Sequence, residues 1–253
     1  IMKLCPDATI VVSRKGSESV PGHYHMDWNF QVVKTGDHIS LGTNDLVFVE
    51  AQMLHWPDSM FTYFTGHGGI LMPNDAFGQH YATPFRFNDQ VNNGELFEEA
   101  LKYYANILTP YSDLVLKKID EVLALQIPVS IIAPSHGVIW RKDPMQIVKK
   151  YQEWARQIPE RTAVILYDTM WDATKKMAEA ISAGLTAEGV DSKVFLMPAS
   201  DRNDVITEIL KTKAVIIGSP VLNRGLIPTI APILEDIRGL RFKNKIGAAF
   251  GSY

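Results

Sequence analysis

The chain has 253 residues, 46% of them hydrophobic, so it can bury a sizeable core and is long enough for two domains. Its formal net charge is -3, from 25 Lys and Arg against 28 Asp and Glu. The sequence contains no basic block, which argues against nucleic acid as a partner. No stretch has the apolar length of a membrane span, and the single cysteine, Cys5, cannot form an internal disulfide, so we expect a cytoplasmic protein without membrane contact.

Up to about residue 72 the chain has the short β-branched and aromatic runs that are typical of strands, and helical spacing then follows. The run from Ile158 to Thr162 is polar, and we place a boundary there, between a first domain of residues 1–158 and a second of residues 159–253. In the first domain the predicted strands are 8–13, 28–34, 45–50, 61–65, 69–72 and 129–133, and the predicted helices are 95–108, 113–125 and 144–157.

Strands and helices alternate regularly in the second domain. The predicted strands are 162–167, 193–197, 214–218 and 245–250, separated by helices at 173–187, 202–211 and 228–237. Such alternation implies right-handed crossovers and a doubly wound parallel sheet with helices on both faces. The predicted fold class is therefore α/β.

Three loops of this domain have the composition of a ligand site. The first follows Tyr167 and runs directly into a helix, whose unpaired N–H groups and positive dipole favour a phosphate. Thr169 and Thr174 would add hydroxyl donors, although Thr169 or Asp172 could simply cap the helix. The loops after the third and fourth strands would leave the same sheet edge, and they carry apolar groups and the aromatic ring of Tyr253.

A T-x-x-x-x-T loop, an S-P-x-x-N loop and an F-G-S-aromatic loop, in this order, resemble the three flavin loops of a flavodoxin. The resemblance implies FMN as the ligand, with Trp171 and Tyr253 beside its ring; an unliganded regulatory domain is the alternative. A flavodoxin-like sheet has one strand more than the four predicted here, so we expect this domain to be truncated. The implied cofactor-binding residues are Thr169, Met170, Trp171, Asp172, Ala173, Thr174, Ser219, Pro220, Val221, Leu222, Asn223, Gly225, Gly251, Ser252 and Tyr253.

Three stretches of the first domain place a His or Asp where an apolar strand gives way to a loop. They are M-L-H-W-P-D-S-M around His55, M-P-N-D-A-F-G-Q-H around Asp75 and A-P-S-H-G-V-I-W-R around His136. Imidazole and carboxylate groups at strand ends can converge on one point, and they suit zinc, iron or manganese. Each residue alone also has an ordinary structural explanation, as a backbone-bonded histidine, a turn cap or a loop histidine.

Together with Y-Y-A-N-I-L-T-P, from Tyr103 to Pro110, and Y-D-T-M-W, from Tyr167, these motifs resemble the flavodiiron proteins over essentially the whole chain. The resemblance implies a metallo-β-lactamase-like αββα domain with a non-haem diiron centre, followed by a flavodoxin-like domain with FMN. It implies reduction of dioxygen to water, or of nitric oxide to nitrous oxide, with electrons from rubredoxin or a similar donor, in a head-to-tail homodimer. Carried over to this sequence, His55 and His136 match ligand histidines, and Asp75 matches the bridging carboxylate.

Three other polar residues near these motifs have simpler explanations. Asp58, three residues after His55, is expected in a turn or in support of a ligand. His67 stands between two glycines and is expected in a solvated hairpin. His80 follows the Asp75 motif and is expected to pack or to support a ligand.

The run His23-Tyr24-His25-Met26-Asp27 could chelate a metal, because alternate residues of a strand share one face. It leads into a strand-like run, however, and Trp28 stands where the metallo-β-lactamase motif has a further histidine. We therefore expect a polar strand entry rather than metal ligands.

The first ligand cluster of the resembled family, an H-x-E-x-D-type run, does not occur in these residues. We therefore expect an internal segment of a longer enzyme, which lacks some iron ligands as well as the end of the flavodoxin domain and binds iron poorly by itself. Two other classes of function stay open. One is a zinc-dependent hydrolase of the metallo-β-lactamase fold, and the other is a flavin electron carrier with a structural first domain.

Overall fold

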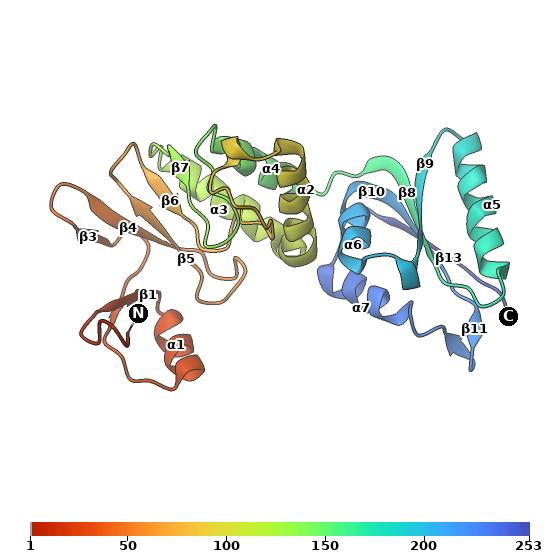
Figure 1. The fold of residues 1–253 in the computed structure, drawn as a ribbon, viewed down its shortest axis with the longest axis horizontal. Coiled ribbons are helices and arrows are strands. Elements are labelled where there is room, and N and C mark those ends of the chain that lie inside the picture. The colour runs from red at the N-terminus through yellow and green to blue at the C-terminus, as the bar shows by residue number, and fades with distance from the viewer. Residues whose placement is uncertain (1) are drawn as a thin grey trace. The chain divides into compact units, whose positions relative to one another are not determined.

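The computed structural model describes residues 2–253, which divide into two compact units (Figure 1). The first unit runs to Ala100 and resumes over Tyr111–Gln152; the second comprises Leu101–Pro110 and Glu153–Tyr253. The domain boundary at residue 158 stays a prediction, because compact units need not coincide with the domains of a family.

A five-stranded sheet forms the centre of the first unit, with its strands in chain order. Strands β3 to β6 pair antiparallel, and β7 pairs parallel with β6. Phe61 and Tyr63 of β5 are buried, while Met60, Thr62 and Phe64 are partly exposed, which is the alternation of a strand with one covered face. The bounds are β3 (His38–Ser40), β4 (Asp45–Glu50), β5 (Met60–Phe64), β6 (Ile70–Met72) and β7 (Ile131–Ile132).

Apolar residues at helical spacing account for the three long helices between residues 93 and 155. Val115 and Ile119, four residues apart, are the buried hydrophobic side chains of α3, and α4 buries Ile147, Val148 and Tyr151. These helices are α2 (Asn93–Tyr103), α3 (Ser112–Ala124) and α4 (Met145–Ala155), and the shorter turns are η1 (Asn88–Gln90), η2 (Tyr104–Leu108) and η3 (Thr109–Tyr111).

The predicted helix at 95–108 is α-helical only as far as Tyr103 and continues as the π-helical turn η2. Side chains here compete with backbone N–H groups for hydrogen bonds to the carbonyls of the helix. The Thr109 hydroxyl donates to the Ala105 carbonyl at 2.8 Å, while the Thr109 N–H reaches back five residues to the Tyr104 carbonyl. Asn106 donates to the Asn203 carbonyl at 3.1 Å, a contact within the second unit, to which η2 belongs.

Residues Gly16–Tyr24 form a helix, α1, that the sequence analysis did not predict. It connects β1 (Ile10–Val12) to β2 (Phe30–Val32), which pair parallel as a separate two-stranded sheet. Two glycines and Pro21 lower the helical propensity of the run, but the Ser13 hydroxyl accepts the Gly16 N–H at 3.1 Å and starts the helix.

The expected polar strand entry at His23 and His25 is therefore wrong. His23 lies in the last turn of α1, and His25 ends the helix with a left-handed φ of 53°. Residues two apart on a helix do not face each other, so the arrangement that a strand would have given for chelation does not arise.

The second unit contains a four-stranded, fully parallel sheet in the order β13–β10–β8–β9. Read from β9 and numbered along the unit, the order is second, first, third, fourth, as in flavodoxin-like sheets, and it confirms the predicted doubly wound fold. The central strand β8 is buried from Ala163 to Tyr167, as a parallel strand covered on both faces should be. The strands are β8 (Glu160–Tyr167), β9 (Asp191–Leu196), β10 (Thr212–Gly218) and β13 (Ile246–Phe250).

Helix α5 (Ala173–Ala187) covers one face of this sheet, and α6 (Arg202–Lys211) and α7 (Ala231–Leu240) cover the other (Figure 1). The first crossover runs from β8 to β9, and the later ones run in the opposite direction across the sheet. Because all are right-handed, this reversal moves α6 and α7 to the opposite face and creates the switch point between β8 and β10. The remaining elements are η4 (Met197–Ala199), β11 (Val221–Leu222) and β12 (Gly225–Leu226).

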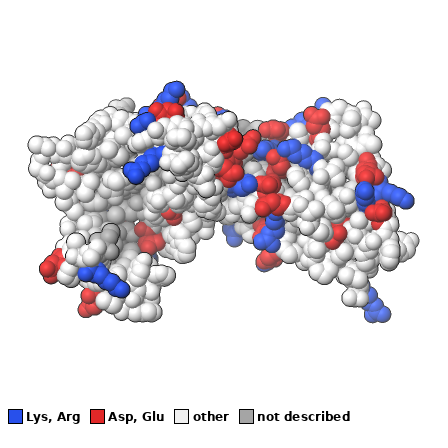
Figure 2. All heavy atoms as spheres, in the orientation of Figure 1, with Lys and Arg blue, Asp and Glu red and all other residues white. Residues whose placement is uncertain are grey.

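Charged side chains of both signs are interspersed on the face shown in Figure 2, without an extended basic patch. This agrees with the near-neutral composition. Within residues 2–253, the helices are all too short or too polar to cross a membrane.

Lys245, directly before β13, provides a test of the second unit. Its Nζ donates to the carbonyls of Leu210 and Thr212, at 2.8 and 2.5 Å, and burial, with a smaller effect of Lys213, lowers its pKa from 10.5 to about 8. Between these two pH values the unfolded chain holds a proton that the folded chain has lost. The free energy of unfolding contributed by this group should therefore rise with pH between about 8 and 10.5.

We expect Lys245→Met to remove this rise, measured as the slope of unfolding free energy against pH in urea titrations. Lys176→Met, on the exposed side of α5, should keep the wild-type slope. Equal slopes for Lys245→Met and wild type would contradict the assignment.

Candidate functional site

The structure brings His55, Asp75 and His136 together in the first unit. Nε2 of His55 lies 3.5 Å from Oδ2 of Asp75, and Nε2 of His136 lies 3.8 Å from Oδ1 of the same carboxylate. Each imidazole therefore faces a different oxygen of one shared carboxylate.

Strand direction explains why these three residues meet. Strands β4, β6 and β7 all run the same way, because β5 is antiparallel to both β4 and β6 while β7 is parallel to β6. Their carboxyl ends lie at one edge of the sheet, and His55, Asp75 and His136 stand on the loops that leave this edge. The His55 loop is closed by the Met53 N–H to Trp56 carbonyl bond at 2.8 Å, and its Leu54–His55 peptide is cis.

The spacing of these groups suits an ion between each pair. Separations of 3.5 and 3.8 Å exceed the range of an N–H···O hydrogen bond. Two donors on one metal ion, each bonded at about 2.1 Å, lie about 3.4 Å apart at a tetrahedral angle.

Hydrogen bonds orient His136 and Asp75. Nδ1 of His136 lies 3.2 Å from the Gln79 carbonyl oxygen, which can only accept, so Nδ1 donates, and an unprotonated Nε2 directs its lone pair at Asp75. A cation between that lone pair and the carboxylate stabilises the pair. On the other side, the Ser135 hydroxyl donates to Oδ1 of Asp75 at 2.5 Å.

His55 also favours the form that binds metals. Burial is the main cause that lowers its pKa; Asp75 opposes this effect and His136 adds to it. A neutral imidazole is the metal-binding form. Within residues 2–253, no group of three or more His, Cys, Asp and Glu side chains surrounds a single ion, and the arrangement fits a carboxylate shared between two ions.

Three neighbouring polar residues lie outside the group formed by His55, Asp75 and His136. Asp58 lies in a turn, where its Oδ2 accepts the Ser19 hydroxyl at 2.6 Å. His67 is exposed in the hairpin between β5 and β6, as expected. The His80 ring lies 5.3 Å from the His136 ring, centroid to centroid, and is exposed.

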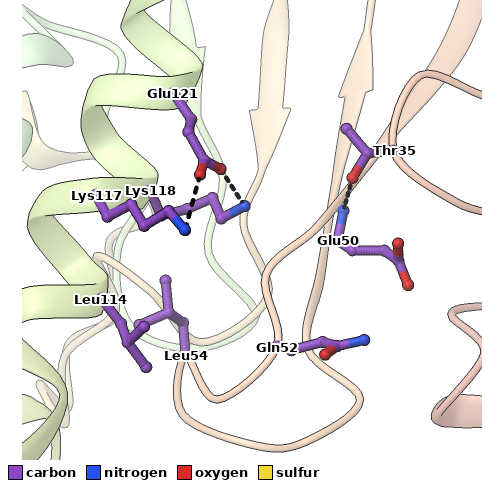
Figure 3. Close-up of a pocket in the computed structure, with 8 residues that line it drawn as sticks. All are labelled: Thr35, Glu50, Gln52, Leu54, Leu114, Lys117, Lys118 and Glu121. Carbon is purple, nitrogen blue, oxygen red and sulfur yellow. Dashed lines mark hydrogen bonds and ion pairs between the residues drawn. The ribbon is translucent and has the colours of Figure 1, made fainter.

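A polar cavity of about 330 Å³ lies between α3 and the end of β4 (Figure 3). Its two lysines, Lys117 and Lys118, both face Glu121, at 3.9 and 2.5 Å. The cavity contains none of the predicted ligands, and the charges that α3 brings to it, Lys117, Lys118 and Glu121, pair with one another. Its lining residues are Thr35, Glu50, Gln52, Leu54, Leu114, Lys117, Lys118 and Glu121.

In the second unit, the three predicted flavin loops leave the carboxyl edge of the sheet together. Val221 N–H donates to the Ser252 carbonyl at 2.8 Å, which joins the second loop to the third, and the hydroxyls of Thr174 and Ser252 lie 3.3 Å apart, which joins the third to the first. Gly251 allows this approach, because a Cβ there would lie 2.2 Å from the Ser219 carbonyl oxygen.

The first loop fits a phosphate better than a simple helix cap. Asp172 precedes α5 in a left-handed conformation, with φ of 60°, and its side chain makes no capping bond within the described chain. The Thr169 hydroxyl is buried and has no partner among residues 2–253. A buried polar group without a partner costs about 1–3 kcal/mol, so this hydroxyl is better explained by an acceptor on a ligand than by capping.

Flat and apolar groups border the same edge. Trp171 is 88% exposed, and Tyr253 is exposed in the third loop. The second loop is a short hairpin of β11 and β12, which turns at Asn223 and Arg224 with φ of 51° and 62°.

Three polar residues of these sites were missed by the sequence analysis. They are Ser135 and Gln79 in the first unit and Asp168 in the second. Asp168 is 5% exposed; it accepts the Thr169 N–H at 2.7 Å and bonds the Thr229 hydroxyl, so it holds the first loop to the turn before α7. Only its position as an acid at the end of an apolar strand could have drawn attention to it.

We expect Thr169→Val to weaken FMN binding by about 10- to 150-fold, because a hydrogen bond to a charged group contributes about 1.5–3 kcal/mol. The flavin-free protein should keep its stability, since the variant removes a buried hydroxyl without a partner within the described chain. Thr186→Val, at the far end of α5, is the matched control. FMN fluorescence titration measures the affinities, and an unchanged affinity in Thr169→Val would contradict a phosphate at this loop.

Comparison with known proteins relates both units to one family. A family model of flavodoxins matches residues 165–253. Over its full length, the chain is 53% identical to a nitric oxide reductase of Moorella thermoacetica, of which it covers 63%. It is 48% identical to an anaerobic nitric oxide reductase flavorubredoxin of Klebsiella pneumoniae, of which it covers 53%.

Solved structures agree with these matches. The rubredoxin oxygen:oxidoreductase of Desulfovibrio gigas superposes with a TM-score of 0.95 at 40% identity, over 99% of this chain and 63% of that protein. The flavodiiron protein of Giardia intestinalis gives a TM-score of 0.91 at 32% identity, over 97% of this chain and 60% of that protein. The chain thus spans between half and two thirds of the length of these relatives, and over its own length it is similar to flavodiiron proteins.

Proposed function

We propose that the protein to which this chain belongs reduces dioxygen to water, nitric oxide to nitrous oxide, or both, at a diiron centre. One observation carries the proposal: the Asp75 carboxylate lies between two imidazoles, and each of its oxygens faces one Nε2. Relatives named nitric oxide reductase and rubredoxin oxygen:oxidoreductase support the reaction class.

His55 and His136 would each provide an imidazole to one iron, and Asp75 would bridge the two. The remaining iron ligands would come from parts of the protein outside these residues. When bound, a pair of adjacent irons would supply the redox chemistry that the reduction of a small diatomic molecule requires. The contribution of this chain is geometric: Ser135 and the Gln79 carbonyl hold the bridging carboxylate and one imidazole in place.

FMN would occupy the carboxyl edge of the sheet in the second unit and supply the electrons. Its phosphate would accept the Thr169 hydroxyl and the N–H groups at the start of α5. Its ring would lie beside Trp171 and Tyr253, which are exposed at that edge. The hairpin residues Val221–Gly225 would border the ring.

The family resemblance supports three further parts of the proposal. The electron donor would be rubredoxin or a similar protein, and a head-to-tail homodimer would bring the FMN of one subunit to the diiron centre of the other. The metallo-β-lactamase-like domain would extend to residue 158 and the flavodoxin-like domain from 159 onward. The single cysteine supports a cytoplasmic location.

Neither alternative class of function has an observation in its favour. A zinc hydrolase would leave the joined loops at the flavin edge without a purpose. A flavin electron carrier with a structural first domain would leave the two imidazoles facing one carboxylate unexplained.

The reaction is tested in the natural full-length protein with chemically reduced rubredoxin as the donor. Consumption of dioxygen and of nitric oxide is followed with electrodes, and metal content by elemental analysis. We expect consumption of at least one gas, about two irons and one FMN per chain. A zinc-loaded protein that consumes neither gas would exclude the proposal.

Asp75→Asn and His136→Ala, in the same full-length protein, should lower iron content by at least half and gas consumption by about 100-fold or more, because each removes a ligand. The FMN absorption spectrum should stay unchanged, because the flavin lies in the other unit. His67→Ala is the control, since this histidine is exposed in a hairpin. Full iron content in Asp75→Asn would refute the bridging role.

A further inference from the structure

Gln79 is a buried amide in the loop that carries Asp75, with 1% of its surface exposed. Its side chain makes three hydrogen bonds. Nε2 donates to the carbonyls of Phe77 and Val138, at 3.1 and 3.3 Å, and Oε1 accepts the Val138 N–H at 2.8 Å. Because two acceptors face one end of the amide and a donor faces the other, its orientation is determined.

The backbone of Gln79 contacts the same neighbouring loop. Its carbonyl oxygen lies 3.2 Å from Nδ1 of His136. The loop that carries His136 is therefore held by Gln79 twice, through the side chain at Val138 and through the backbone at the imidazole.

Glycines allow the two loops to approach this closely. A Cβ at Gly137 would lie 2.1 Å from Oε1 of Gln79, and Gly137 also has a φ of 79°. A Cβ at Gly78 would lie 2.6 Å from Cε1 of His136. Both glycines are needed for the contact between Gln79 and His136, so the two loops are shaped around it.

We propose that Gln79 is a positioning residue for the metal centre: its amide fixes the loop so that its own carbonyl accepts Nδ1–H of His136 and directs the Nε2 lone pair at Asp75. This inference rests on the proposed function only where it assigns a metal ion to the Nε2 lone pair. Which nitrogen of His136 carries the proton depends on the residues of this chain and not on a metal.

A purely structural role for a buried glutamine is the competing explanation, and the chain contains a matched control. Gln157 in the second unit is 2% exposed, and its Oε1 accepts the Lys243 N–H at 2.8 Å. Gln79→Met and Gln157→Met each keep the length of the side chain and remove a buried amide. Both should lower the melting temperature, but only Gln79→Met should change the tautomer of the His136 ring.

The experiment uses the natural full-length protein, labelled with ¹⁵N-histidine and first freed of metal. Side-chain ¹⁵N shifts report the tautomer of each ring, and His136→Ala assigns the signal of His136. Wild type and Gln157→Met should show His136 as the Nδ1–H tautomer alone, and Gln79→Met should show a mixture with Nε2–H. Ferrous iron affinity, measured against a chelator, should fall about 10-fold in Gln79→Met and stay unchanged in Gln157→Met.

Gln79→Glu provides a second variant of nearly the same volume. It places an oxygen against the carbonyls of Phe77 and Val138 in place of the Nε2 donor, so we expect the same mixture of tautomers as in Gln79→Met. If Gln79→Met does not fold, this variant carries the comparison with Gln157→Met.

The possible failures are distinguishable. An Nε2–H tautomer of His136 in the wild type overturns the inference without any variant, and so do wild-type shifts and iron affinity in Gln79→Met or Gln79→Glu. A wild-type protein that shows the Nδ1–H tautomer but binds no iron overturns the proposed function and leaves the positioning role intact.

Discussion

The candidate metal centre depends on one carboxylate that faces two imidazoles. Nδ1 of His136 donates to the Gln79 carbonyl, and Nε2 of the same ring faces the Asp75 carboxylate. With a cation on each side of the carboxylate, the same groups attract one another. The surrounding hydrogen bonds, from Ser135 to Asp75 and from His136 to Gln79, hold this arrangement in place before any metal arrives.

In both units the candidate site residues are brought together by the same geometry of the sheet. Loops at the carboxyl ends of strands that run the same way meet at one edge, whether the strands are adjacent, as β8 and β10 are, or separated by an antiparallel strand, as β4 and β6 are. The rest of each sheet serves as a rigid support for these loops. The mixed sheet of the first unit can therefore gather ligands from loops that are distant in sequence, as the parallel sheet does for the flavin loops.

Local sequence was sufficient to predict the bounds of helices and strands where apolar periodicity and intrinsic propensity agreed. Helices 173–187 and 202–211 and strand 45–50 have the bounds that were predicted, because each is a continuous pattern with clear ends. The prediction of helices failed where hydrogen bonds from side chains determine the backbone conformation. Helix α1 forms against the propensities of two glycines and Pro21, and the helix predicted to 108 changes to a π turn at Tyr104, because Thr109 and Asn106 compete for its carbonyls.

The sequence by itself determined the fold class, most of the elements and the family motifs, since these follow from short-range patterns; α1 and β3 were not predicted. It also named His55, Asp75, His136 and the three flavin loops as candidates. Only the tertiary structure decided which groups face one another: that each imidazole faces its own carboxylate oxygen, that Asp168 holds the first flavin loop, and that Gln79 orients His136. The physical reason is that such contacts join loops far apart in the chain, 57 residues for Gln79 and His136, and these loops meet only once the sheet has formed.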